Sequence, residues 1–317
     1  MQETETTPTV GAIVWATGWQ PYDADKIQPY GHDRYDNVVS SVEFERMLDP
    51  HGPTGGKIRI GDMVPQDIVF IHCVGSRDCS IDHPWCSRVC CMYAIKQSLV
   101  IKEKFGETIE PTIFYMDMRT FGKSFQRYRQ QAETLYGVRF LRGRVHSVAL
   151  DAESGDMLIR SVDISGKSSD SRYDMVVLTV GQRPAAGTSE LADLLDLELN
   201  PWGFGNTSPF SLTRTGRDGI LLGGSFAGLK DIGDSVIQAS AAALDASRVI
   251  HSSGGSLALK PPPPPPQEDP CSLASFDRPR PSSSPSAAAP WARTTSRPTS
   301  PLPRTSLCTN YTCGTSR

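Results

Sequence analysis

The feature that most constrains this chain is a group of five cysteines that begins where an apolar segment ends. The segment QDIVFIHCVGSRD (66–78) is a short run rich in Val and Ile that enters a glycine turn, which is typical of a buried strand in a parallel sheet. The five cysteines all lie within residues 73–91, and Cys90 and Cys91 are adjacent. The residues alone leave four explanations open: disulfide bonds, a zinc site, an iron–sulfur cluster or a redox-active pair of thiols.

The composition argues against several classes of protein and favours a reducing compartment. The chain has 317 residues, 38% hydrophobic and 21% charged, which fits a soluble globular protein of one or two domains. A net charge of −3 without a basic cluster argues against nucleic-acid binding, and no apolar run approaches the roughly 20 residues that span a bilayer. The start MQETETTPTV has no signal-peptide pattern, so we expect a cytoplasmic protein. There, clustered cysteines bind metal or do redox chemistry more often than they form disulfides.

The composition changes sharply near the C-terminus. After residue 252 the chain contains a run of six prolines and then a stretch rich in Pro, Ser, Thr and Arg, which has too little apolar surface to form a core. We therefore predict that residues 253–317 are disordered. Cys271, Cys308 and Cys313 lie in this tail, and their wide spacing makes them poor candidates for ligands.

Strands and helices are expected to alternate after the first apolar segment. The pattern predicts strands over 111–120 and 138–150 and helices over 86–106 and 123–137, with Gly106 ending the first helix. Such alternation is typical of βαβ units and a parallel sheet. The part near 145–175 has the character of a small antiparallel excursion from that sheet.

Two further units resemble parts of a known group of flavoproteins. The segments AIVWATGWQP (12–21) and MVVLTVGQRP (175–184) are both hydrophobic strands that close on a glycine, a polar residue and a proline, and 9–23 as a whole is predicted to be a buried strand with a glycine turn. Residues 218–250 are predicted to form a strand, a glycine turn and a helix that starts near Asp231. These units resemble the strands and the flavin-contacting helix of the thioredoxin reductase and glutathione reductase group.

The dinucleotide-binding fingerprint of that group is absent at both expected places. No G-x-G-x-x-G precedes residue 9, so the chain resembles the C-terminal part of such a flavoprotein. In the second lobe CVGSRD stands where the fingerprint would follow the strand, and we infer that a metal centre replaces the pyrophosphate. We thus expect an α/β, two-lobed dinucleotide-binding fold without its N-terminal ADP-binding part. The predicted divisions are 1–62 (end of the FAD lobe and connection), 63–184 (second Rossmann-like lobe with the cluster), 185–252 (return to the FAD lobe) and 253–317 (disordered tail).

The spacing of the cysteines suits a metal centre with four thiolate ligands. Cys86 and Cys90 are four residues apart and would share one helix face, with Cys91 one step round the helix and Cys73 approaching from the strand end. Four such thiolates suit a 4Fe–4S cluster or a tetrahedral zinc ion. The absence of short C-x-x-C knuckles favours the cluster over zinc, and a Cys90–Cys91 disulfide would be strained. Cys79 lies in the loop and is not expected to be a ligand.

The cysteine pattern also resembles one family closely. The context CVGSRD…CSRVCCMYAIKQ, with GPTGG (52–56), FYMDMRTFGK (114–123) and KDIGDSVIQASAAA (230–243), resembles the iron–sulfur flavoprotein A-subunit of heterodisulfide reductase over roughly 9–250. The resemblance implies that the four cysteines, Cys73, Cys86, Cys90 and Cys91, ligate one 4Fe–4S cluster beside FAD. It implies an oxidoreductase that passes electrons to partner subunits and draws them from a donor such as ferredoxin, hydrogenase or dehydrogenase, with bifurcation and a homodimer left open.

The resemblance also implies which residues contact the flavin, whereas it assigns no catalytic residue. For Asp231 ordinary helix capping is an equal alternative, Gln238 could equally face solvent, and Ser225 stands where related flavoproteins often have an acidic residue. The implied contacts are Thr17, Gly18, Gly223, Gly224, Lys230, Asp231, Ile232 and Gln238.

Several residues near the cysteines have less specific interpretations. Arg119 and Lys123 follow a strand where some relatives bind a phosphate, but without the fingerprint we expect them to be exposed or to dock a partner. His72 is expected to support the ligands or to be exposed, and Trp85 and Tyr93 to pack beside the cluster. An alternative function is a non-catalytic scaffold, stabilised by a cluster or by zinc, that docks redox partners, or a truncated fragment.

Overall fold

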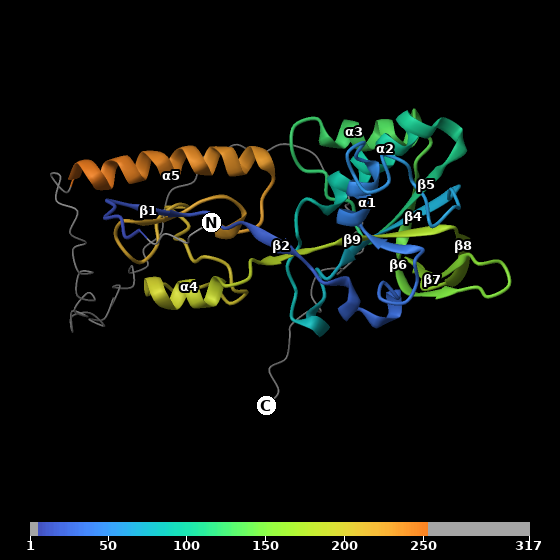
Figure 1. Cartoon of the computed structure of the whole chain (residues 1–317), viewed down its shortest axis with the longest axis horizontal. Helices are drawn as coiled ribbons and strands as arrows, with labels where there is room; N and C mark the ends of the chain where they lie inside the picture. Colours follow the sequence, from blue (N-terminus) through green and yellow to red (C-terminus); the bar gives the residue numbers. More distant parts are fainter. Residues whose placement is uncertain (1–5, 253–317) are drawn as a thin grey trace, which may run out of the picture. The chain divides into compact units, whose positions relative to one another are not determined.

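The computed structural model describes residues 6–252 and contains one large sheet with helices on it (Figure 1). This sheet has seven strands, in the spatial order β3-β9-β4-β5-β6-β7-β8. In that order the strands are Val38–Ser40, Met175–Val180, Asp67–Val74, Glu110–Tyr115, Arg139–Leu150, Met157–Asp163 and Ser168–Tyr173.

The large sheet is parallel where the chain forms βαβ units and antiparallel where it forms hairpins. β3, β9, β4, β5 and β6 pair in parallel, and β6, β7 and β8 pair antiparallel. All six residues of β9 are buried, as expected for a strand covered on both faces. The predicted parallel sheet and its antiparallel excursion are therefore both confirmed.

Three helices cover one face of the large sheet, and the main hydrophobic core lies beneath them. Figure 1 shows α1, α2 and α3 together on this face. The core contains Phe44 of α1, Phe70 of β4 and Ile95 of α2, all without measurable exposure, and the two phenylalanine rings meet edge to face with centroids 5.5 Å apart. The helices are α1 (Ser41–Leu48), α2 (Cys90–Phe105), α3 (Phe125–Thr134), α4 (Thr188–Leu195) and α5 (Ile232–Ser252).

Two smaller sheets contain the first of the two similar segments of the sequence and the end of the second, which begins with β9 of the large sheet. β1 (Ile13–Trp15) pairs in parallel with β11 (Ile220–Leu222). β2 (Trp19–Pro21) pairs antiparallel with β10 (Gln182–Pro184), so the ends of the two similar segments lie against each other. The similarity in sequence thus reflects two strands that end at a common ribbon.

The predicted order of a strand and then a glycine turn over 9–23 is confirmed, with the turn at Gly18, but the expectation that the strand is buried is wrong. The segment forms two three-residue strands, and within β1 only Trp15 is buried, whereas Ile13 and Val14 are 37% and 46% exposed. Among the described residues β1 has β11 as its one strand partner, so its other edge is uncovered there. An apolar run therefore indicates a strand here without indicating its burial.

The last unit has the predicted order of strand, glycine turn and helix. β11 leads into the 3₁₀ turn Gly224–Ala227, and α5 begins at Ile232. Trp15 stacks on Phe226, with ring centroids 4.3 Å apart, and Leu222 completes this smaller core.

The helix predicted over 86–106 begins four residues later, at Cys90. Arg88 has a φ of +67°, which a right-handed helix cannot contain, and the Ser87 hydroxyl accepts a hydrogen bond from the backbone N–H of Gln182 at 2.8 Å. This contact holds the preceding loop in a non-helical path. Cys86 therefore lies on a loop, and the expectation that Cys86 and Cys90 share a helix face is wrong.

Other predicted boundaries need smaller changes. The helix predicted over 123–137 spans Phe125–Thr134, and β3 and α1, which precede residue 63, pair or pack with the large sheet rather than with β1. The proposed division at residues 62, 184 and 252 stays a prediction, and the tail 253–317 with its three cysteines lies outside the described residues. Within 6–252, no helix combines the length and the apolar character that crossing a membrane requires.

Candidate functional site

Cys73 lies where strand β4 is distorted. The register between β4 and β9 shifts between Ile71 and Val74, and Cys73 itself has a φ of +62°. A left-handed conformation costs a residue other than glycine of order 1–3 kcal/mol, and bulges of this kind redirect a side chain near functional sites. The distortion turns the Cys73 side chain out of the regular alternation of the strand.

The loop that carries Cys86 is fixed to the turn between β9 and β10. The Trp85 indole N–H donates to the carbonyl of Gln182 at 3.1 Å, and Ser87, which is fully buried, accepts from the N–H of the same residue. Gly181 must lack a side chain, because a Cβ there would lie 2.8 Å from the Ser87 hydroxyl oxygen. The loop is therefore a defined structure, and it brings Cys86 to the strand end.

Cys90 and Cys91 are the first two residues of α2. Both are buried, with 5% and 7% exposure, and the helix has no side-chain cap at its N-terminus. The free backbone N–H groups and the dipole of a helix N-terminus favour negative charge. This position suits thiolates, as the sequence predicted.

The four predicted ligands form one electrostatic neighbourhood. None of the five cysteines within residues 6–252 forms a disulfide. Burial, together with the negative charges of neighbouring members of the set, raises the pKa of Cys73 and Cys90 and raises that of Cys91 to about 11. Such buried thiols become thiolates when a metal cation compensates their charge. The donor set therefore fits a cationic metal centre.

Nitrogen donors surround the sulfur atoms. The backbone N–H of Arg88 donates to Cys86 Sγ at 3.3 Å, and that of Arg119 donates to Cys91 Sγ at 3.4 Å. The positive charges of the Arg119 and Arg77 guanidinium groups also act on Cys86 and Cys73, respectively. Hydrogen bonds to cysteine sulfur are one means by which proteins set the potential of an iron–sulfur cluster.

Asp117 joins two of these arginines. Its carboxylate forms an ion pair with Arg77 through Oδ1 and accepts a hydrogen bond from Arg119 Nε at 3.2 Å through Oδ2. Burial raises the pKa of Asp117, but Arg77 and Arg119 together outweigh that effect and lower it. Sequence reasoning did not find Arg77 or Asp117. It expected Arg119 to be exposed or to dock a partner, and the Arg119 side chain is 39% exposed although its backbone N–H contacts Cys91.

The described side chains do not form a ready site for a single metal ion. Within residues 6–252, no group of three or more His, Cys, Asp and Glu side chains is arranged to hold one ion. A tetrahedral zinc ion needs thiolates about 3.8 Å apart, because each Zn–S bond is about 2.3 Å long. Each cysteine around a 4Fe–4S cube binds a different iron, so its ligands lie further apart.

Two buried side chains complete the surroundings of the sulfurs. The Tyr93 hydroxyl donates to the carbonyl of Val180 at 2.8 Å, so Tyr93 packs beside the cysteines as expected. His72 is 7% exposed, both ring nitrogens lack a hydrogen-bond partner within the described structure, and burial lowers its pKa to about 4. His72 and Cys73 both line a small cavity of about 50 Å³.

The connection from β2 to α1 packs against the same strand end. Gly75 has a φ of +71°, and a Cβ on it would lie 2.1 Å from Cγ of Tyr22, so the Tyr22 ring lies directly on the glycine. The Tyr30 hydroxyl donates to the carbonyl of Val145 at 3.2 Å. The connection therefore covers the turn that follows Cys73.

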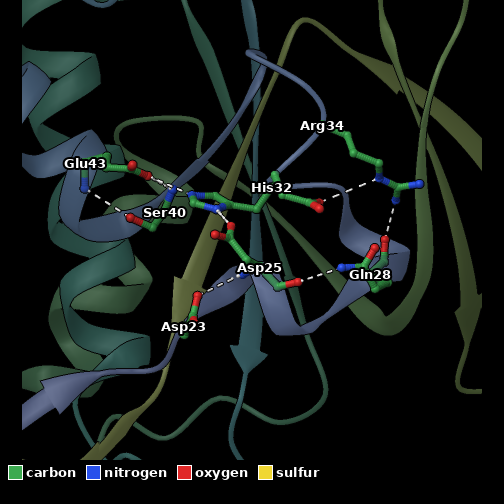
Figure 2. A network of polar contacts seen from close by, with 8 residues as sticks. Asp23, Asp25, Gln28, His32, Arg34, Ser40 and Glu43 are labelled. Atoms are coloured by element: carbon green, nitrogen blue, oxygen red, sulfur yellow. Dashed lines mark hydrogen bonds and ion pairs between the residues drawn. The ribbon is translucent and has the colours of Figure 1, made fainter. Parts of the chain in front are cut away.

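A histidine between two carboxylates holds this connection in place, as Figure 2 shows. His32 contacts Asp25 through Nδ1 at 2.5 Å and Glu43 through Nε2 at 2.9 Å. Ser40 and Glu43 form a reciprocal capping box at the start of α1, with the Ser40 N–H donating to the Glu43 carboxylate at 2.7 Å. Burial lowers the pKa of His32, but the two carboxylates together raise it above its usual value.

The structure brings only some of the predicted flavin contacts together in one groove. A groove of about 660 Å³, here called the β1 groove, includes five of the eight predicted residues in its lining. The Lys230 ammonium donates to the carbonyls of Gly224 and Gly228 at 2.8 and 2.6 Å, and burial lowers its pKa. The five are Gly223, Gly224, Lys230, Asp231 and Ile232.

The other three predicted contacts lie outside the lining of the β1 groove. Thr17 accepts a hydrogen bond from the Trp15 indole at 2.9 Å, and Gly18 has a φ of +72° in the turn that follows. Gln238 is buried and donates to the carbonyl of Leu212 at 2.6 Å, so it is neither on the groove nor in solvent.

The start of α5 connects the flavin-side residues to the cysteine loop. Asp231 accepts a hydrogen bond from the Asp234 N–H at 2.8 Å, so Asp231 both caps α5 and lines the β1 groove. Asp234 in turn forms an ion pair with Arg88, two residues before Cys90. The two predicted cofactor sites are thus joined by a direct side-chain contact.

The fold and the cysteine site together define a class of protein. The structure resembles thioredoxin reductase from Lactococcus lactis, with a TM-score of 0.50 and 16% identity over 76% of this chain and 66% of that one, which shows the fold. No protein-family model matches the chain. The chain therefore has the α/β, two-lobed fold of the thioredoxin reductase class, as the sequence predicted, with a cysteine cluster at the end of β4.

Curated relatives identify the family within that class. The chain is 40% identical over 267 residues to the second iron–sulfur A-subunit of the CoB–CoM heterodisulfide reductase of Methanopyrus kandleri, covering 83% of the chain and 40% of the relative. It is 42% identical over 239 residues to the corresponding A-subunit of Methanocaldococcus jannaschii, covering 74% and 36%. The chain belongs to the heterodisulfide reductase A-subunit family, and it spans about two fifths of the length of these relatives.

Proposed function

We propose that the chain is the electron-transfer part of an iron–sulfur flavoprotein and holds one 4Fe–4S cluster through Cys73, Cys86, Cys90 and Cys91. The observation that carries the proposal is the gathering of these four thiols from a strand end, a loop and a helix start, with backbone N–H groups directed at two of the sulfurs. The family supports the same assignment, because the relatives are named iron–sulfur subunits.

The residues around the sulfurs would control the charge and the access of water. A bound 4Fe–4S cluster exchanges single electrons and carries negative charge together with its thiolates. The Arg77 and Arg119 guanidinium groups offset that charge, and Asp117 fixes both in position. The burial of Cys90 and Cys91 keeps solvent from the helix start.

The β1 groove is the proposed site of the flavin ring. A bound FAD exchanges two electrons and can pass them on singly. The ammonium of Lys230 and the N-terminus of α5 place positive charge at one end of the groove, which favours the anionic reduced ring. The Arg88–Asp234 ion pair holds this helix end next to the cysteine loop, so the two sites stay close.

The proposed activity is that of an oxidoreductase subunit in a heterodisulfide reductase-like complex, acting on sulfur groups. A relative from Methanothermobacter thermautotrophicus, 40% identical over 83% of this chain, is named as the A-subunit of a H₂:CoB-CoM heterodisulfide,ferredoxin reductase. By that similarity we propose partner redox subunits with ferredoxin or a hydrogenase as electron carrier, and bifurcation between ferredoxin and a disulfide.

Anaerobic loading with iron and sulfide tests the cluster assignment. We expect about four iron and four sulfide per chain. Cys90→Ala should lose most of both, whereas Cys79→Ala, which removes a thiol from the same loop, should retain both. One zinc per chain without sulfide would contradict the proposal.

Flavin binding tests the second cofactor separately. We expect the fluorescence of FAD to be quenched when FAD binds the chain. Lys230→Met should weaken that binding about tenfold, because the substitution removes one charged contact. Lys167→Met, on the β7–β8 turn, serves as the control. The exposure of Ile13 and Val14 in β1 favours a second candidate, a scaffold that docks redox partners without flavin. A cluster without any FAD binding would select that candidate.

A further inference from the structure

A second groove lies where three helices begin. It has a volume of about 700 Å³, and its lining includes the residues at the starts of α2, α3 and α5. These are Arg88 and Val89, Ser124 and Phe125, and Asp231 and Ile232. Each helix N-terminus carries the positive end of a dipole, and those of α2 and α3 have no side-chain cap, whereas Asp231 caps α5. We call this the three-helix groove, and its potential is positive before any side chain is counted.

The charged side chains of the three-helix groove add to that potential. Five of the lining residues are cations, and Asp231 is the one acid among them. Three of the cations already have carboxylate partners, whereas Lys123 and Arg127 form no ion pair within the described residues. The five cations are Arg88, Lys96, Arg119, Lys123 and Arg127.

The start of α3 is unfavourable for the free protein. The N-cap residue Ser124 makes no side-chain cap hydrogen bond, and the first turn contains no acidic residue. Arg127 instead places a cation in that turn, where the helix dipole opposes positive charge. An anionic group bound here would relieve this arrangement, so the groove is suited to a negatively charged partner.

The apolar part of the groove has the composition of a protein interface. Its lining includes Met92, Phe121, Phe125 and Tyr128. Phe121 is 46% exposed, although the Arg88 guanidinium stacks on its ring at 4.9 Å, and Ile232 on the rim is 85% exposed. Aromatic residues, methionine and arginine are enriched at the centres of interfaces, where a few of them supply most of the binding energy.

The three-helix groove also borders the cysteine site. Met92 and Tyr93, which line it, follow directly on Cys90 and Cys91. The backbone N–H of Arg119, another lining residue, donates to Cys91 Sγ at 3.4 Å. A partner seated in the groove would therefore lie within a few bonds of the proposed cluster ligands.

We propose that the three-helix groove is the docking surface for a small acidic protein that carries single electrons. The inference rests on the proposed function and names where the carrier binds. Its carboxylates would meet Lys123 and Arg127, and an apolar residue beside its redox centre would cover Phe121. The exchange moves one electron between the carrier and the proposed cluster, so that one is oxidised as the other is reduced, and no bond forms or breaks. A nucleotide is a poorer fit, because no glycine-rich phosphate turn follows β4.

Binding to a redox-inactive carrier tests the docking alone. The probe is a two-iron plant-type ferredoxin with gallium in place of iron, titrated against the full chain at several salt concentrations. We expect the double variant Lys123→Glu, Arg127→Glu to weaken binding at least about tenfold at low salt and to flatten the salt dependence. Lys26→Glu, Lys57→Glu changes the net charge equally at exposed positions away from the groove and should leave binding unchanged.

A second variant separates the apolar contribution from the charge. Phe121→Ala should weaken binding about tenfold while the salt dependence stays as in the parent chain. Equal binding by the parent chain and the double variant would overturn the proposal. So would saturable binding of FMN or NADH that depends on Arg127, which would indicate a nucleotide site. Because the probe needs no cluster, an absent cluster would count against the proposed function and not against the docking surface.

Discussion

The large sheet and the β1–β11 region differ in how completely their strands are covered. In the large sheet β9 is buried along its whole length, and α1, α2 and α3 close one face over a continuous core. In the region formed by β1, β11, α4 and α5, a core around Trp15, Leu222 and Phe226 is much smaller. Several large apolar side chains of β1 and α5 are exposed there: Ile13, Val14, Ile232, Val236, Ile237 and Leu244.

This difference separates the two proposed cofactor sites. The four cysteines belong to elements of the large sheet or to the loop fixed on it, so their arrangement follows from a well-packed core. The flavin-side residues belong to the β1–β11 region, where five of eight predicted contacts line one groove. We therefore expect the cluster site to tolerate damage to the β1–β11 region, and the flavin site to depend on both regions.

Truncating one buried aromatic residue in each region tests this comparison with the largest expected effect. Phe70→Ala should lower the free energy of unfolding by about 3–5 kcal/mol, because Phe70 is fully buried against Phe44. Iron and sulfide binding should fall with it. Trp15→Ala removes a similarly buried ring that stacks on Phe226, but it should disrupt mainly the β1–β11 region.

Hydrogen exchange and iron analysis of the two variants check this expectation. After Trp15→Ala, exchange should rise in α5 and β11 while β4, α2 and the iron content stay near those of the parent chain. If Trp15→Ala removed the cluster as completely as Phe70→Ala, the two regions would form one cooperative unit and the contrast would be wrong.

Asp117 offers a finer test of the site on the large sheet. Asp117→Asn removes one negative charge beside the sulfurs and keeps one oxygen, which can accept from Arg77 or from Arg119. Reduction adds negative charge to a cluster, so the loss of a carboxylate should raise the reduction potential. The expected rise is about 60 mV, which corresponds to about 1.4 kcal/mol for one electron.

A potentiometric titration followed by electron paramagnetic resonance measures this shift in the loaded chain. Asp170→Asn on β8 breaks an exposed ion pair with Arg160 and should leave the potential unchanged. An unchanged potential in Asp117→Asn would show that the two arginines do not act on the centre through this carboxylate.

The sequence predicted the parts of the site that depend on local pattern. The strand that ends at Val74, the helix that contains Cys90 and Cys91 and the strand–turn–helix that ends in α5 all have short-range signals, namely apolar runs, glycine turns and helical periodicity. The parallel order of the strands followed from their alternation with helices. Because these signals are local in the sequence, the fold class could be predicted from the sequence alone.

The parts that were missed depend on contacts between distant segments. Arg77 and Asp117 are 40 residues apart and meet because β4 and β5 are neighbours whose carboxyl ends lie at one edge of the sheet. A search for opposite charges after adjacent parallel strands could have found this pair. The left-handed conformations of Cys73 and Arg88 have no such signal, because neither residue type favours positive φ.

The smallest expected effect concerns the clamp around His32, which holds the connection between the two regions. The two carboxylates raise the pKa of His32 relative to the unfolded chain. The protonated histidine should therefore stabilise the fold fully below its unfolded pKa of about 6.5, and this contribution should be lost as the pH rises through the higher folded pKa. Since Asp25 and Glu43 are more than half exposed, we expect about 1 kcal/mol or less.

Urea unfolding of the parent chain and of His32→Gln at pH 6 and pH 9 measures this effect. The variant should be less stable than the parent chain at pH 6 and about equal to it at pH 9, because the neutral histidine no longer pairs with both carboxylates. His51→Gln, which replaces an exposed histidine after α1, controls for other titrating groups. A difference that grew toward pH 9 would have the opposite sign and would contradict a charged clamp. A difference in the free energy of unfolding that is equal at pH 6 and pH 9 would indicate that His32 contributes through packing and not through its charge.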